Sequence, residues 1–172
     1  MNPGAAIEEM TEEEEERLYH EQNLDLLLFD LGGERYAAPL LQVKEIVEPK
    51  ELKDVPKTAD TFAGVFNLRG CVIGAFDLRQ QFATSTTSYA TKAYLVCETD
   101  LGQMALLVDK AVDVKTILRT SLRSENALSG IFNHSFVTGV VNIEETIVTI
   151  VDLEKVLLDQ DTDAPAVPGS LP

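Results

Sequence analysis

Short runs of apolar residues, each about the length of a β-strand, follow one another along most of the chain. They are continuous or alternate with polar residues, which is typical of strands buried on one or both faces. Gly32 and Gly33 follow the first run, and Asp100 to Gly102 follow a later one, which predicts two hairpins. The sequence therefore predicts an all-β fold with short helices. The runs are residues 24–31, 34–40, 71–77, 92–99, 103–109 and 146–152.

Short helices are expected between these strands. Residues 40–47 carry apolar side chains at positions i, i+3 and i+6, which predicts one helical piece. Asp77 and Asp152 each stand just before a helical pattern. An aspartate at that place accepts hydrogen bonds from the free backbone N–H groups of the first helical turn. We therefore interpret both aspartates as helix caps.

The two ends of the chain differ from the middle. Residues 1–23 are rich in glutamate, so like charges repel and little apolar surface offsets the entropy of ordering. We expect a disordered acidic tail there, with a helical stretch near residues 17–22. Residues 159–172 combine proline and aspartate without periodicity, which predicts a second disordered tail. The folded part is expected to be a single domain over residues 24–158.

A repeat divides this domain. Residues 64–82 and 139–157 are similar without a gap at an offset of 75 residues, and residues 36–46 are more weakly similar to residues 104–114 at an offset of 68. Two small barrels joined side by side would close most strand edges. We expect the first at about residues 24–83 and the second at about 91–158, with segments exchanging between them and residues 84–89 as a linker. The identical pairs at the offset of 75 are Gly64 and Gly139, Val65 and Val140, Asn67 and Asn142, Asp77 and Asp152, and Leu78 and Leu153.

One turn breaks the repeat. Arg69 and Gly70 occupy positions where the second copy has Glu144 and Glu145. The duplicated scaffold therefore does not require Arg69, whereas Asn67 suits a turn in both copies. A guanidinium group offers a rigid fork of donors for carboxylates or carbonyls of a partner. Arg69 is accordingly a candidate contact residue.

Charge and composition exclude several classes of partner. The net charge of -15 opposes binding to nucleic acid or to an anionic membrane, because both need clustered basic residues. No apolar stretch approaches the roughly 18 residues of a membrane span, and the N-terminus lacks a secretory signal pattern. We therefore expect a cytoplasmic protein without membrane insertion. Cys71 and Cys97 lie in apolar runs, which predicts buried, reduced thiols.

Evidence for catalysis is weak. Asp77 and Asp152 on related halves suggest an aspartic-protease-like hydrolase as a distant alternative, yet neither is followed by the Thr or Ser and Gly of that class. His20 and His134 are too far apart for a helical pair of metal ligands. We expect no enzymatic activity, no metal and no cofactor.

Three segments together resemble the CheW-like chemotaxis coupling proteins, in that family's order and spacing. They are residues 29–48, 62–82 and 136–157, and the most specific element is N-L-R-G at 67–70 followed by a strand and D-L-R at 77–79. The resemblance implies two five-stranded, SH3-like β-barrels. It also implies a non-enzymatic adaptor, recruited to receptor arrays, that links chemoreceptor tips to the regulatory domain of the histidine kinase CheA. Gly74 departs from the pattern, since relatives commonly have proline there.

The resemblance also implies binding positions. Receptor helices are expected in the groove between the barrels, and the kinase at barrel edges. Core packing remains an alternative for Val43, and solvated surface charge remains one for Glu45 and Arg69. A CheW-like subunit of a non-flagellar pathway is the alternative function. The partner-binding positions by motif are Val43, Glu45, Asn67, Arg69 and Gly70.

Overall fold

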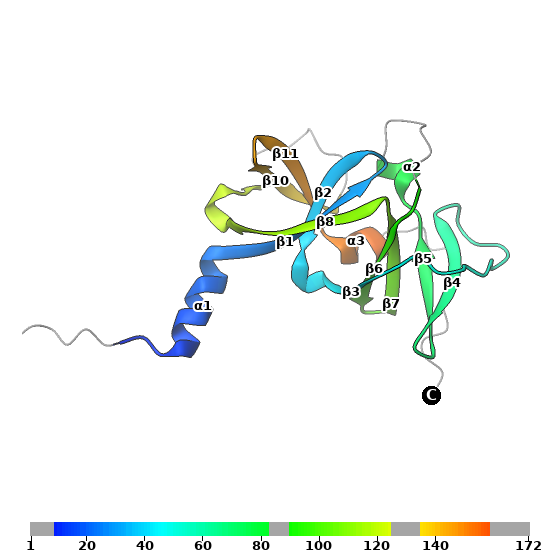
Figure 1. The fold of residues 1–172 in the computed structure, drawn as a ribbon, viewed down its shortest axis with the longest axis horizontal. Helices are drawn as coiled ribbons and strands as arrows, with labels where there is room; N and C mark the ends of the chain where they lie inside the picture. The colour runs from blue at the N-terminus through cyan, green and yellow to red at the C-terminus, as the bar shows by residue number, and fades with distance from the viewer. Residues whose placement is uncertain (1–8, 83–89, 125–134, 159–172) are drawn as a thin grey trace, which may run out of the picture.

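The strands of the described residues form two sheets in which most neighbouring strands are antiparallel, as Figure 1 shows in a computed structural model. The structure describes residues 9–82, 90–124 and 135–158, so the expected linker, the C-terminal tail and His134 lie outside the described residues. The mostly β fold is confirmed. The six-stranded sheet has the order β8 (Lys110–Leu118), β1 (Asn23–Leu31), β2 (Glu34–Pro39), β11 (Thr146–Val151), β10 (Val137–Ile143) and β9 (Arg123–Ser124). The five-stranded sheet has the order β3 (Val43–Val47), β6 (Ala93–Thr99), β7 (Gly102–Val108), β5 (Cys71–Phe76) and β4 (Phe62–Leu68).

The two halves of the repeat exchange their first hairpins. Hairpin β1–β2 lies beside β10–β11 from the second half, and β6–β7 lies beside β4–β5 from the first half. Each sheet therefore combines strands from both sides of residues 83–91, where we expected the boundary between the barrels. Parallel pairs join the hairpins: Tyr36 faces Thr149, and Met104 faces Gly74. The offset of 68 relates Tyr36 to Met104 and the offset of 75 relates Gly74 to Thr149, so the repeat holds in three dimensions.

Buried side chains form one cluster inside each sheet and a third that both sheets share. The shared cluster contains Leu27 and Phe29 from the six-stranded sheet and Leu95 and Leu106 from the five-stranded sheet. Helix α3 (Leu153–Leu158) contributes to it and packs against β6. Burial of the shared cluster removes apolar surface of both sheets from water, which stabilises the association of the two sheets.

The expected helix at residues 40–47 is wrong. Residues Leu40–Gln42 form a single 3-10 turn, η1, and Val43–Val47 form β3, which pairs with β6. The β-branched residues Val43, Ile46 and Val47 favour a strand. A bulge between Val43 and Glu45 shifts the register, which disguised the strand period in the sequence.

The acidic N-terminal segment forms a helix, α1 (Glu12–Gln22), where a disordered tail was expected. Thr11 and Glu14 form a capping box, and glutamates in the first turn interact favourably with the helix dipole. The helix begins well before the stretch that we expected to be helical. It has no buried residue and projects away from both sheets (Figure 1).

Deleting residues 1–20 is therefore expected to leave the melting temperature nearly unchanged. Residues 9–20 are all exposed, and the deletion removes a hydrogen bond to the rest of the described structure, from Arg119 Nε to the His20 carbonyl at 3.1 Å. Circular dichroism melts of both chains measure the difference. Loss of cooperative unfolding in the shorter chain would contradict our proposal that residues 24–158 fold as one unit.

Candidate partner-binding site

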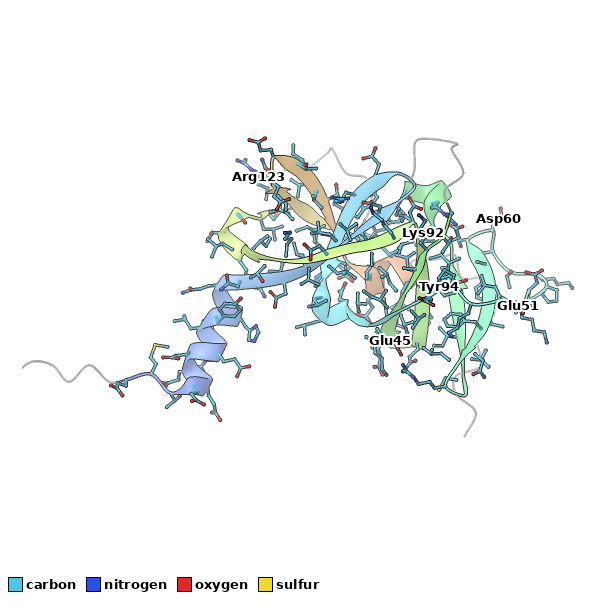
Figure 2. The ribbon with its side chains drawn as sticks, viewed as in Figure 1. Glu45, Glu51, Asp60, Lys92, Tyr94 and Arg123 are labelled. Atoms are coloured by element: carbon cyan, nitrogen blue, oxygen red, sulfur yellow. The ribbon has the colours of Figure 1, made fainter. Side chains whose placement is uncertain are left out.

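Glu45 and Arg69 form a bidentate ion pair, with two hydrogen bonds, at one end of the five-stranded sheet. Arg69 Nη1 and Nη2 donate to Glu45 Oε1 and Oε2, each at 2.9 Å. Glu45 lies on β3 and Arg69 in the β4–β5 turn, so the pair connects the two outer strands of this sheet (Figure 2 labels Glu45). The Arg69 side chain is 76% exposed and that of Glu45 is 21% exposed. Such an exposed pair adds little stability but fixes the guanidinium group in place.

The turn that carries Arg69 is a two-residue hairpin loop. Arg69 has φ 52° and Gly70 has φ 86°, the left-handed conformations that such a loop requires. Asn67 Oδ1 accepts a hydrogen bond from the Gly70 N–H at 3.0 Å. Asn67 and Gly70 therefore shape the turn, and the side chain that the turn presents is Arg69.

Val43 lies on the same strand as Glu45, but its side chain packs against the shared core. The backbone of Val43 pairs with Cys97 of β6. The structure thus brings Glu45 together with the turn residues Asn67, Arg69 and Gly70, and it gives Val43 a packing role. Contact of these residues with a partner stays a prediction.

A second charged cluster occupies the equivalent place on the six-stranded sheet. Lys115 Nζ lies 3.2 Å from Asp113 Oδ2 and 3.4 Å from Glu144 Oε1, which connects the outer strand β8 to the β10–β11 turn. The two repeat offsets relate Asp113 to Glu45 and Glu144 to Arg69. The hydrogen bond from the Val114 N–H, followed by that from Lys115, lowers the pKa of Asp113. Combining both offsets would have placed Asp113 near Glu144 from the sequence, although the repeat gives no signal for Lys115.

The two repeated aspartates are helix caps, as predicted. Asp77 Oδ1 accepts a hydrogen bond from the N–H of Arg79, the first residue of α2 (Arg79–Phe82), at 3.1 Å. Asp152 Oδ1 accepts a hydrogen bond from the Lys155 N–H in α3, also at 3.1 Å. Asp152 also accepts from Gln42 Nε2 at 3.0 Å. Each carboxylate has partners of its own, so in the described structure the two do not form the shared-proton pair of an aspartic protease.

Replacing Asp77 by asparagine is expected to lower the free energy of unfolding at pH 7, because asparagine can still cap the helix but carries no charge to pair with Arg79. Burial raises the pKa of Asp77, but the hydrogen bonds from Arg79 outweigh it and hold this pKa below its ordinary value. A lowered folded pKa stabilises the protein above the unfolded pKa, and this contribution is lost as the pH falls through the folded value. Urea melts at pH 7 and pH 3 should therefore differ less for Asp77→Asn than for the wild type. If both proteins lost the same amount of stability between pH 7 and pH 3, ionised Asp77 would not be the source of the stabilisation.

Other chemistry finds little support in the described residues. None of their His, Cys, Asp and Glu side chains form a group of three or more placed to hold a metal ion. None of the described helices is long and apolar enough to cross a membrane. Cys71 is half-buried, and burial raises the pKa of the Cys97 thiol to about 12.

Known proteins resemble this chain over most of its length. Residues 25–161 match the CheW-like domain. The chain is 29% identical to the chemotaxis protein CheW of Klebsiella aerogenes, over 80% of this chain and 83% of the relative. It is 30% identical to the chemotaxis protein CheW of Helicobacter pylori, over 80% and 84%. The fold is similar to that of the scaffolding protein TtCheW from Thermoanaerobacter tengcongensis, with a TM-score of 0.72 at 21% identity over 85% of this chain and 98% of that one.

Proposed function

The chain belongs to the CheW-like domain family, and from that premise we propose that it is a non-enzymatic adaptor coupling chemoreceptors to the histidine kinase CheA. The observation that carries the proposal is the N-L-R-G turn. Its backbone is fixed by Asn67 and Gly70, and its arginine is held by Glu45 yet largely exposed. A preorganised side chain loses little entropy when it binds a partner.

The chemistry of Arg69 fits a protein partner. A guanidinium group has five N–H donors, and Glu45 receives hydrogen bonds from two of its nitrogens. The exposed remainder can donate to carboxylates or carbonyls of a receptor helix or of the regulatory domain of CheA. In this proposal the receptor tip binds in the groove between the barrels, the kinase binds at barrel edges, and the adaptor works in the cytoplasm at receptor arrays.

Co-sedimentation tests the proposed function. Receptor-containing membranes are mixed with purified CheA, with and without the wild-type protein. We expect more CheA in the pellet when the adaptor is present, because it contacts both components. Equal amounts of CheA in the two pellets would contradict the proposal. A subunit of a non-flagellar chemosensory pathway would give the same result only with the receptor and kinase of that pathway, so running both pairs separates the two functions.

A further inference from the structure

Asp109 is the single residue between β7 of the five-stranded sheet and β8 of the six-stranded sheet. Its N–H donates to the Asp30 carbonyl at 2.9 Å, and its Oδ2 accepts from the Gly33 N–H at 3.0 Å. Asp30 and Gly33 belong to the β1–β2 hairpin. Both the backbone and the carboxylate of Asp109 are therefore fixed to the six-stranded sheet.

Arg79 approaches this carboxylate from the other sheet. Its Nε and Nη2 donate to the two carboxylate oxygens of Asp77, at 2.9 and 2.6 Å, and Nη2 also donates to Thr91 Oγ1 at 2.7 Å. Asp77 follows β5 and Thr91 precedes β6, so both belong to the five-stranded side. Arg79 Nη1 lies 3.7 Å from Asp109 Oδ1. A cation fixed to one sheet thus faces an anion fixed to the other.

Burial makes this contact energetically important. Asp109 is only 9% exposed, the Arg79 side chain is 18% exposed, and Asp109 Oδ1 has no hydrogen-bond partner among the described residues. A separation of 3.7 Å is too long for a hydrogen bond, so the attraction between them is that of opposite charges. A buried carboxylate that loses its counter-charge is strongly unfavourable. Without the charge of Arg79, the buried carboxylate of Asp109 would favour an opening of the junction that lets water reach it.

We propose that Arg79 is a positioning residue whose charge, acting on Asp109, fixes the angle between the two sheets. The same angle sets the spacing between the Glu45–Arg69 pair and the Asp113–Lys115–Glu144 cluster, which lie on different sheets. An adaptor that holds two partners at once depends on this spacing. That consequence rests on the proposed function, whereas the angle itself is a property of the isolated chain.

Pulsed electron paramagnetic resonance tests the proposal on the full chain without partners. Nitroxide labels are placed at Leu101→Cys, in the β6–β7 turn of the five-stranded sheet, and at Ile147→Cys, on β11 of the six-stranded sheet; these residues are 69% and 72% exposed. Cys71→Ser removes the half-buried thiol, and Cys97 is buried. We expect one narrow distance distribution in this background. Arg79→Gln should broaden or shift it, and Arg79→Lys, which keeps the charge, should do so less.

Two further variants separate positioning from general loss of structure. Lys44→Gln removes an exposed ion pair with Glu98 inside the five-stranded sheet, and it should leave the distribution unchanged. Arg79→Gln also leaves Asp77 without its partner, so the rescue is made in a background that carries both Arg79→Gln and Asp77→Asn. Adding Asp109→Asn to that background should restore a narrower distribution, and cooperative folding if the background has lost it. An unchanged distribution in a folded Arg79→Gln protein, or no recovery when Asp109→Asn is added, would overturn the proposal. Because no partner is present, these outcomes do not depend on the co-sedimentation result.

Discussion

Replacing Arg69 by glutamate is expected to keep the fold and to weaken assembly with receptor and CheA by about 1 to 3 kcal/mol. The fold should survive, because the second copy of the turn already carries Glu144 at the equivalent position with φ 49°. Assembly should suffer because the variant places two carboxylates, at positions 45 and 69, where an ion pair now holds the arginine. Co-sedimentation measures the loss, with circular dichroism as the folding control.

A matched control and a charge exchange show how Arg69 acts. Arg35 also makes two hydrogen bonds to a carboxylate, to Asp30 at 2.9 and 3.3 Å, but on the six-stranded sheet, so Arg35→Glu should weaken assembly less than Arg69→Glu does. Exchanging the charges, with Glu45→Arg and Arg69→Glu together, remakes the internal pair and leaves the turn acidic. If assembly recovers in this double variant, Arg69 acts only through its ion pair with Glu45 and does not contact a partner. Wild-type assembly by a folded Arg69→Glu protein would remove Arg69 from the interface altogether.

Features that depend on neighbouring residues were predictable from the sequence. The hairpin at Gly32 and Gly33 joins β1 to β2, and the aspartates at 77 and 152 cap the helices that follow them. Both rest on local conformation and on hydrogen bonds a few residues away. The repeat was visible too, because equivalent positions in two barrels need similar side chains.

Features that depend on distant pairing were not predictable in the same way. The exchange of hairpins follows from contacts such as Tyr36 with Thr149, which no local pattern encodes. The ion pair of Glu45 with Arg69 likewise joins strands that are neighbours only after the sheet closes. The prediction of a helix at residues 40–47 is wrong because their apolar spacing fits a helix, whereas residues Val43–Val47 form a strand that pairs with β6. Tertiary contacts commonly override such a local preference.

Replacing Gly139 by alanine is expected to destabilise the protein by about 3 kcal/mol or more. A Cβ at this position would overlap the backbone oxygen of Arg123 and lie 3.1 Å from Leu122 Cδ1. Arg123 belongs to β9, which pairs with β10 beside Gly139 (Figure 2 labels Arg123). The added methyl group would therefore force β9 away from the sheet. The free energy of unfolding, measured in urea, reports the loss.

Two other glycines separate the cost of an unfavourable backbone conformation from the cost of a steric clash. Gly102 has φ 108° but nothing within 4 Å of a Cβ, so Gly102→Ala tests backbone conformation alone, at about 1 kcal/mol. Gly64, the repeat partner of Gly139, has φ 137°, and a Cβ there would lie 2.8 Å from the Lys53 oxygen, so Gly64→Ala adds both costs. If Gly139→Ala cost no more than Gly102→Ala, β9 would be free to move aside. Large losses at both Gly64 and Gly139 would instead show that a close backbone approach is the constraint that each half of the repeat retains.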